Sequence, residues 1–139
     1  MGQRVKDVMT AGTVALGRDA SLVEAARLMR DHGIGDVIVV EGESAEGIVT
    51  DRDLVIRGIA EGADPSTTRL GQVISPDLVA VAPDDPVERA IELMREKAVR
   101  RLPVVEGGKP VGVVTIGDLA VERDADSVLA DISEEPPTR

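Results

Sequence analysis

Apolar and polar positions along the chain follow two rhythms, one helical and one extended. Between residues 19 and 31 the apolar residues recur at i, i+3, i+4 and i+7, which places them on one helix face: Leu22, Ala25, Ala26 and Met29. Ser21 followed three residues later by Glu24 is typical of a capping box, and Gly33 suits the helix end. The pattern therefore predicts an amphipathic helix.

Runs rich in β-branched residues predict strands on both sides of this helix. One run covers residues 13–16 and another covers residues 37–40, after which the polar residues 41–46 form a turn. Residues 47–50 then return as a strand, so the last two strands predict an antiparallel hairpin. A helix is expected over residues 51–60 with Gly62 near its end, and a short helix or turn over residues 5–10.

The same order of elements occurs a second time. Sliding residues 5–58 onto residues 70–123 needs no gap and gives 17 identical pairs out of 54. The second copy predicts strands at residues 79–81, 102–105 and 111–115. It also predicts a helix that Asp85 caps, with Pro86 in its first turn, and a last helix from residue 116 to about 123.

The fold class is therefore α+β, with two tandem β-α-β-β-α repeats. One repeat of about 55 residues buries its apolar face poorly alone, so we expect the two to pack on each other with pseudo-two-fold symmetry. The expected divisions are a first repeat at residues 5–62, a linker at 63–69, a second repeat at 70–123 and an acidic tail at 124–139. We expect the end of the tail to be disordered.

Composition and charge narrow the function. The 139 residues contain no Cys, one His, and no Phe, Tyr or Trp, and the formal net charge is −10. We therefore expect no thiolate or histidine metal site, no Ser-His-Asp machinery, and no enzyme. The negative charge argues against nucleic acid and anionic membrane surfaces as partners. The sequence lacks an apolar run of about 20 residues and an apolar signal region, which favours the cytoplasm.

Each repeat ends its hairpin on the same motif, a strand that runs into a helix through Thr-x-x-Asp. Thr50 and Asp53 form the first turn, and Thr115 and Asp118 form the second turn. One interpretation is structural, because Thr followed by Asp three residues later imitates a capping box. The other is a ligand site, because a helix start offers N–H groups to an anion and an Asp can accept both hydroxyls of a ribose. Together these groups suggest a nucleotide.

The doubled pattern resembles a tandem cystathionine-β-synthase (CBS) domain pair, the Bateman module, over about residues 5–123. The resemblance rests on Val8-Met9-Thr10, Ala25-Ala26-x-Leu28-Met29, Gly47 to Leu54, Arg100 to Val105 and Gly112 to Leu119. The chain is similar to small stand-alone members of the hypoxic-response and stress type. Such modules are regulatory and have no catalysis of their own, require no cofactor, and bind AMP, ADP, ATP or S-adenosylmethionine in the cleft between the repeats.

The resemblance implies two nucleotide sites of unequal quality. The favoured site combines Thr115, Asp118, Arg100, Arg101, Leu102, Pro103 and Val79. The weaker site combines Thr50, Asp53, Val14, Val37 and Asp36. The weakness is inferred from Gly35 and Asp36, which replace the arginine pair, since a carboxylate repels a phosphate. Arg52 could compensate, although an ion pair at the surface or in a dimer interface is the preferred interpretation.

The resemblance also implies a homodimer and a regulated protein of unknown identity. Because Bateman modules pair through their helices, the alternative function is a homodimeric interaction module whose ligand sites are vestigial.

Overall fold

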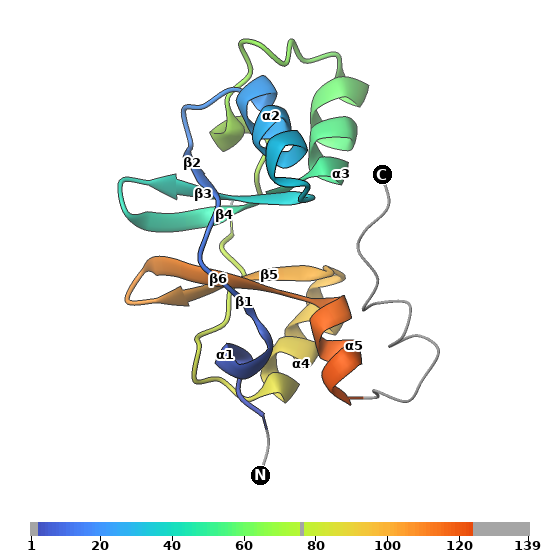
Figure 1. The fold of residues 1–139 in the computed structure, drawn as a ribbon. Helices are drawn as coiled ribbons and strands as arrows, with labels where there is room; N and C mark the ends of the chain where they lie inside the picture. The colour runs from blue at the N-terminus through green and yellow to red at the C-terminus, as the bar shows by residue number, and fades with distance from the viewer. Residues whose placement is uncertain (1–2, 76, 124–139) are drawn as a thin grey trace. The chain divides into compact units, whose positions relative to one another are not determined.

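The computed structural model describes residues 3–75 and 77–123, which form two compact units (Figure 1). The first-repeat unit comprises Thr13–Val79 and Gly107–Pro110. The second-repeat unit comprises the described residues of 3–12, 80–106 and 111–123. The predicted tail at 124–139 lies outside the described residues.

The first-repeat unit is built on a three-stranded sheet in the order β2-β3-β4. Strand β2 (Ala15–Gly17) pairs in parallel with β3 (Asp36–Glu41), and β3 pairs in antiparallel with β4 (Ser44–Thr50), so the predicted hairpin is confirmed. Strand β4 begins at Ser44 rather than at Gly47, because residues 44–46 join the ladder beyond an irregularity between Val39 and Val40. The predicted six-residue turn is therefore shorter.

Helix α2 (Leu22–His32) confirms the helix predicted from the apolar spacing. Its start is held reciprocally: Ser21 Oγ accepts from the Glu24 amide at 3.2 Å, and Glu24 Oε2 accepts from the Ser21 amide at 2.7 Å. Its end is Gly33, whose φ of 64° is left-handed and therefore favours glycine. Leu22, Ala25 and Met29 are buried in the core of this unit.

The helix predicted after the hairpin is a continuous helical segment in which three types of helix follow one another. It consists of α3 (Asp51–Asp53), a π turn η1 (Leu54–Gly58) and a 3₁₀ turn η2 (Ile59–Glu61), and it ends at Gly62. In Figure 1 this run and α2 lie together on one face of the β2-β3-β4 sheet. The chain continues to a further 3₁₀ turn, η3 (Leu70–Gln72).

The second-repeat unit has the sheet β1-β6-β5, formed by β1 (Thr10–Ala11), β5 (Arg101–Glu106) and β6 (Lys109–Thr115). Helices α4 (Val87–Lys97) and α5 (Ile116–Arg123) belong to the same unit. The predicted strand at residues 79–81 is reduced to a single parallel bridge between Val81 and Val104.

The N-terminal segment, residues 3–12, belongs to this second-repeat unit, although the repeat in the sequence assigns it to the first. It contains α1 (Val5–Val8), and its strand β1 pairs with Val113 and Gly112 of β6. The amides of Val5 and Lys6 donate to the carbonyls of Asp85 and Pro83, both at 2.9 Å. The compact units therefore differ from the predicted domain divisions at both ends of the first repeat.

The prediction that Asp85 caps α4 is wrong. The N-cap residue is Pro86, which has no side-chain capping bond. The Asp85 carboxylate instead accepts a hydrogen bond from the Ala82 amide at 2.9 Å, which closes the turn before the helix. The Asp85 carboxylate therefore stabilises the turn that precedes the helix, and not the first turn of the helix as the sequence spacing predicted.

Candidate functional site

The Thr-x-x-Asp motifs form the same reciprocal capping box in both units. In the first turn, Thr50 Oγ1 accepts from the Asp53 amide at 3.1 Å, and Asp53 Oδ2 accepts from the Thr50 amide at 2.9 Å. In the second turn, Thr115 and Asp118 make the same two bonds at the same two distances. The capping interpretation is therefore confirmed, and in each Asp it uses the oxygen Oδ2.

Each turn is also fastened to the start of the neighbouring strand. The Asp51 amide donates to the Gly35 carbonyl at 3.0 Å, and the Ile116 amide donates to the Arg100 carbonyl at 2.8 Å. The second bond brings the backbone of Arg100 beside the second turn, which starts one residue before Ile116. The sequence motif and the arginine pair, far apart along the chain, thus belong to one locality of the second-repeat unit.

The first turn does not offer the unpaired amides that the ligand interpretation expected. The amides of Asp51, Arg52 and Asp53 all donate to protein acceptors, and the acceptor for Arg52 is the Asp51 carboxylate at 2.8 Å. In the second turn Ile116 replaces Asp51, so the Gly117 amide has no carboxylate of that kind beside it. An anion would therefore meet less competition at the second turn.

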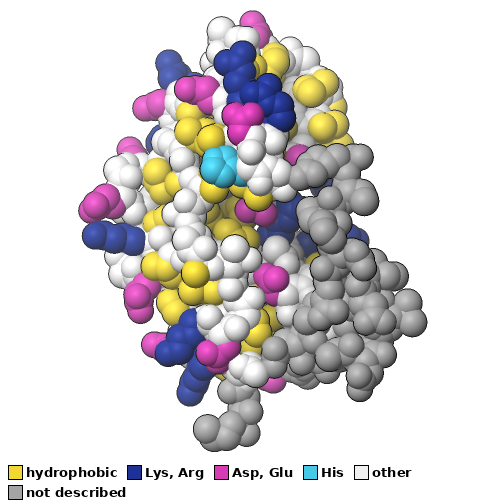
Figure 2. All heavy atoms as spheres, in the orientation of Figure 1, with side chains coloured by type: hydrophobic (Ala, Val, Ile, Leu, Met, Phe, Trp, Pro, Cys, Tyr) yellow, Lys and Arg dark blue, Asp and Glu magenta, His cyan; other side chains and the backbone are white. Residues whose placement is uncertain are grey.

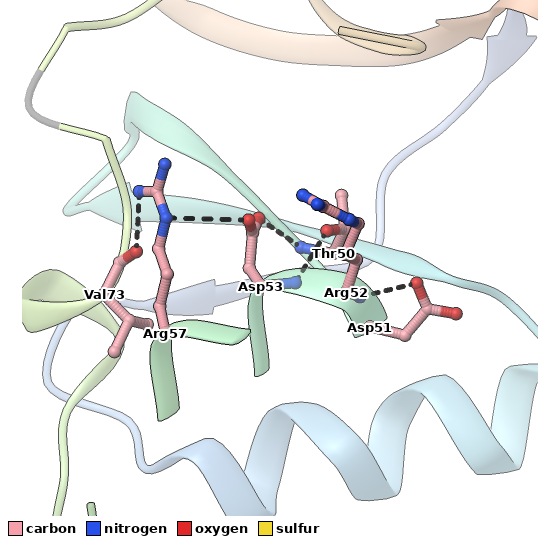
Figure 3. A network of polar contacts seen from close by, with 6 residues as sticks. All are labelled: Thr50, Asp51, Arg52, Asp53, Arg57 and Val73. Carbon is pink, nitrogen blue, oxygen red and sulfur yellow. Dashed lines mark hydrogen bonds and ion pairs between the residues drawn. The ribbon is translucent and has the colours of Figure 1, made fainter. Parts of the chain in front are cut away.

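Arg57 contacts the first turn from the π turn η1, and the Thr-x-x-Asp motif of the sequence does not include it. Its Nη1 donates to the Val73 carbonyl at 3.2 Å, and its Nε lies 3.9 Å from Asp53 Oδ1. Figure 3 shows the side chains of Arg52 and Arg57 on the same side of the helical run as the Asp53 carboxylate. The only sequence signal was the i, i+4 spacing of Asp53 and Arg57.

The other residues predicted for the weaker site all lie in the first-repeat unit. Asp36 is half-buried and is the ladder partner of Thr50, so its backbone lies directly beside the first turn. The Val14 carbonyl accepts from the Ile38 amide at 3.0 Å, and the Val37 side chain is fully buried. The unit therefore brings Asp36, Thr50 and Asp53 together, whereas the contact of Val14 and Val37 with a ligand stays a prediction.

The residues predicted for the favoured site lie in the second-repeat unit, except Val79. Arg100 is exposed and Arg101 is half-buried, and Arg101 takes part in a polar interaction. Leu102 and Pro103 are buried, and the Pro103 carbonyl accepts from the Val81 amide at 3.2 Å. Val79 ends the first-repeat unit, so its contribution stays a prediction.

Figure 2 shows one face of the molecule, on which Lys and Arg side chains lie among Asp and Glu side chains. Within the described residues, no group of three or more His, Cys, Asp or Glu side chains is arranged to hold a metal ion. No helix of this part of the chain combines the length and the apolar composition that crossing a membrane requires.

Comparison with known proteins places these turns in a family. The family model of the CBS domain matches the chain twice, over residues 5–58 and 70–123. The CBS domain-containing protein YhcV of Bacillus subtilis is 38% identical over 135 residues, which cover 94% of this chain and 96% of that protein.

Solved structures agree with this assignment. The crystal structure of Hypoxic Response Protein I, which has two coordinated zinc ions, is 34% identical with a TM-score of 0.79, over 86% of this chain and 98% of that one. The CBS domain pair of protein MJ0100, in complex with 5′-methylthioadenosine and S-adenosyl-L-methionine, has a TM-score of 0.81 over 91% and 100% of the two chains. At 21% identity it shows the fold alone. The chain belongs to the CBS domain family and carries two copies of the domain in tandem.

Proposed function

We propose that the chain is a regulatory module that binds an adenosyl ligand at its two Thr-x-x-Asp turns, without catalysing a reaction. The ligand would be an adenine nucleotide or S-adenosylmethionine, and no cofactor is required. The observation that carries the proposal is the joining of the second turn to Arg100 by the Ile116 amide at 2.8 Å. In this proposal Asp118 accepts from the ribose diol, and the bond supports the proposal because it brings the backbone of Arg100, which precedes Arg101, to the turn that carries Asp118.

Each carboxylate keeps one oxygen outside the capping box. Asp118 Oδ2 accepts from the Thr115 amide, which leaves Oδ1 as the acceptor for ribose hydroxyls. The guanidinium groups of Arg100 and Arg101 would pair with phosphate, which Arg binds well because its donors form a planar fork. The complex of protein MJ0100 with two adenosyl compounds supports this ligand class.

The two turns should differ in their preference for charge. Three carboxylates belong to the first turn or lie next to it: Asp51 and Asp53 follow Thr50 in the chain, and Asp36 is the ladder partner of Thr50. The Asp51 carboxylate already accepts a hydrogen bond from the Arg52 amide. The second turn has one aspartate, Asp118, and the bond between the Ile116 amide and the Arg100 carbonyl brings the backbone of Arg100 beside this turn, with Arg101 next in the chain. We therefore propose that phosphate-bearing ligands prefer the second turn, and that the first turn suits a less anionic adenosyl compound.

Isothermal titration calorimetry with AMP, ADP, ATP and S-adenosylmethionine tests the proposal. Asp118→Ala should weaken nucleotide binding about ten- to a hundredfold, because a hydrogen bond to a charged group contributes roughly 1.5–3 kcal/mol. Asp118→Asn keeps an acceptor for the Thr115 amide, so it separates loss of the ligand contact from loss of the cap. Asp53→Asn is the matched variant at the first turn. Unchanged affinity in both Asp118 variants would disprove the ribose role of Asp118.

A second candidate function is a homodimeric interaction module with vestigial sites, and exposed apolar surface favours it. In the first-repeat unit, Val55, Ile56 and Ile59 are 51%, 48% and 64% exposed. Ile59 also lines a hollow of about 370 Å³ whose other walls include Leu22, Ala26 and Leu54. In the second-repeat unit the corresponding hollow, of about 410 Å³, is lined by Ile91, Met94 and Ile116 among others.

A thermal-shift panel separates the two functions. Stabilisation by any of AMP, ADP, ATP, S-adenosylmethionine or NAD supports ligand binding, because a ligand that binds only the folded state raises the melting temperature. If none of them shifts the transition while light scattering gives twice the monomer mass, the interaction module is the better proposal. A homodimer that also binds nucleotide is compatible with the first function, in which the dimer would act on a regulated protein.

A further inference from the structure

Residues 63–75 of the first-repeat unit, which we call the connecting segment, are held on the rest of that unit by backbone hydrogen bonds. The amides of Leu70 and Gly71 donate to the carbonyls of Ala20 and Arg18, both at 2.9 Å. The 3₁₀ turn η3 ends before Val73, and carbonyl groups at a helix end lack partners within that helix. Arg57 donates to the Val73 carbonyl at 3.2 Å, so a side chain from another element satisfies this group.

The same guanidinium faces the candidate ligand acceptor of the first turn. Asp53 Oδ2 is occupied by the Thr50 amide, whereas Oδ1 lies 3.9 Å from Arg57 Nε. The Asp53 side chain is 24% exposed and the Arg57 side chain is 50% exposed. One planar group therefore reaches the free oxygen of Asp53 with Nε and the connecting segment with Nη1, as Figure 3 shows.

We propose that Arg57 is a positioning residue that orients Asp53 and couples the first turn to the connecting segment. The hydrogen bond from Arg57 to the Val73 carbonyl and the contact of Arg57 with Asp53 are both present without a ligand. The consequence for binding rests on the proposed function: ribose hydroxyls that bind the Asp53 carboxylate, which Arg57 orients, alter the contact between Asp53 Oδ1 and Arg57, and a change in Arg57 reaches the segment that leads into the second-repeat unit. The first turn is thereby the one that can transmit its occupancy along the chain.

The second turn lacks the residue for such a coupling. Glu122 occupies the position that corresponds to Arg57, and Gly117 occupies the position of Arg52. The helical run also differs, since Arg57 lies in the π turn Leu54–Gly58, whereas the corresponding helix α5 is regular. Single π turns inside helices are frequent at functional sites. The coupling is therefore a property of the first repeat.

Hydrogen–deuterium exchange of the full-length chain without ligand tests the coupling directly, in the peptide that covers residues 69–75. Arg57→Gln should raise exchange there roughly three- to tenfold, the equivalent of one lost hydrogen bond at a half-exposed site. Arg52→Gln is the matched control, because it removes the same charge from the same helical run and should leave this exchange unchanged. Arg57→Lys should restore only part of the protection, since an ammonium group lacks the fork that spans two acceptors.

The role of Asp53 is tested by the double variant. Asp53→Asn keeps an acceptor for the Thr50 amide but loses the charge, so it should raise exchange about twofold. In the Arg57→Gln background it should add nothing, because residues that act through one contact are not additive. Unchanged exchange in Arg57→Gln, or additive effects in the double variant, would overturn the proposal.

A ligand arm separates this proposal from the proposed function. S-adenosylmethionine is the probe, because the first turn is proposed to prefer a less anionic compound. Arg57→Gln should weaken its binding at the first turn several-fold and abolish any change that it causes in the exchange of residues 69–75. Equal affinity of the wild type and Arg57→Gln for S-adenosylmethionine would refute the positioning role. If neither S-adenosylmethionine nor AMP, ADP or ATP binds the wild type, the proposed function is refuted, while the ligand-free exchange still decides whether Arg57 couples Asp53 to the segment.

Discussion

Gly112 and Gly47 occupy the same position of the repeated motif, yet they face different neighbours. A Cβ atom on Gly112 would lie 2.6 Å from the Thr10 carbonyl oxygen and 3.0 Å from Met9 Sδ. A Cβ atom on Gly47 would meet Ile74 Cδ1 at 3.6 Å, which is an ordinary contact. We therefore expect Gly112→Ala to destabilise the protein and Gly47→Ala to be tolerated.

The contacts of β1 set bounds on the free energy of unfolding that Gly112→Ala should lose. If β1 stays in place, the overpacked methyl group costs about 1–3 kcal/mol. If β1 moves away, the two ladder pairs with Val113 and Gly112 are lost, at about 1 kcal/mol for each hydrogen bond. Retreat of the whole segment is opposed by Val5, which is fully buried. Both routes give a loss of about 2 kcal/mol.

Gly47→Ala should be neutral or stabilising by up to about 1 kcal/mol, because alanine loses less backbone entropy than glycine in a strand. Urea unfolding followed by far-ultraviolet circular dichroism measures the difference, since the chain has no aromatic residue to report by fluorescence. The two free energies of unfolding should differ by about 2–3 kcal/mol. Agreement within about 0.5 kcal/mol would refute the packing of the N-terminal segment on β6.

Three further substitutions test other contacts. Lys6→Met should raise the pKa of Asp84, because the hydrogen bond from Lys6 and then its charge hold that pKa below its ordinary value; a carboxyl NMR titration measures it. A lowered folded-state pKa stabilises the protein above the unfolded pKa and is lost as pH falls through the folded value, so the variant should lose less stability on acidification. Gly58→Ala should cost about 1 kcal/mol in urea unfolding, because its Cβ would lie 2.7 Å from the flexible end of Leu22, and full stability would contradict this close approach. Ala98→Gly should stabilise by about 1 kcal/mol in the same assay, because φ is 55° there, and a loss of stability would contradict the left-handed helix end.

The elements predictable from the sequence are those whose causes are local. Helix α2 follows from its apolar spacing, from Ser21 at its start and from Gly33 at its end, and each signal lies within the element. Asp85 shows the limit of this approach, because Asp, followed by Pro and then Glu, imitates a helix start. The repeat itself held the better signal, since it aligns Ser21 with Pro86, the observed N-cap.

The features that the sequence did not predict depend on distant partners. The N-terminal segment pairs with β6, and no local pattern distinguishes that partner from the hairpin of the first repeat. Arg57 reaches a backbone carbonyl sixteen residues away, a contact that depends on where the connecting segment lies and on no property of Val73. For the candidate site, the capping bonds of Thr50 with Asp53 and of Thr115 with Asp118 were predictable, because the motif and the geometry coincide in one turn, whereas ligand contact stays a prediction.

The pairing of β1 with β6 has a consequence for synthesis of the chain on the ribosome. Most of the first-repeat unit is one continuous stretch, Thr13–Val79, which can begin to fold while the rest is still being translated. The N-terminal segment leaves the ribosome earlier, but its partner Val113 is among the last described residues to appear. Until β6 has been made, the residues of β1 have no strand to pair with, and unpaired strand edges can pair with other chains. Translation speed after Val79 should therefore influence the yield of correctly assembled protein.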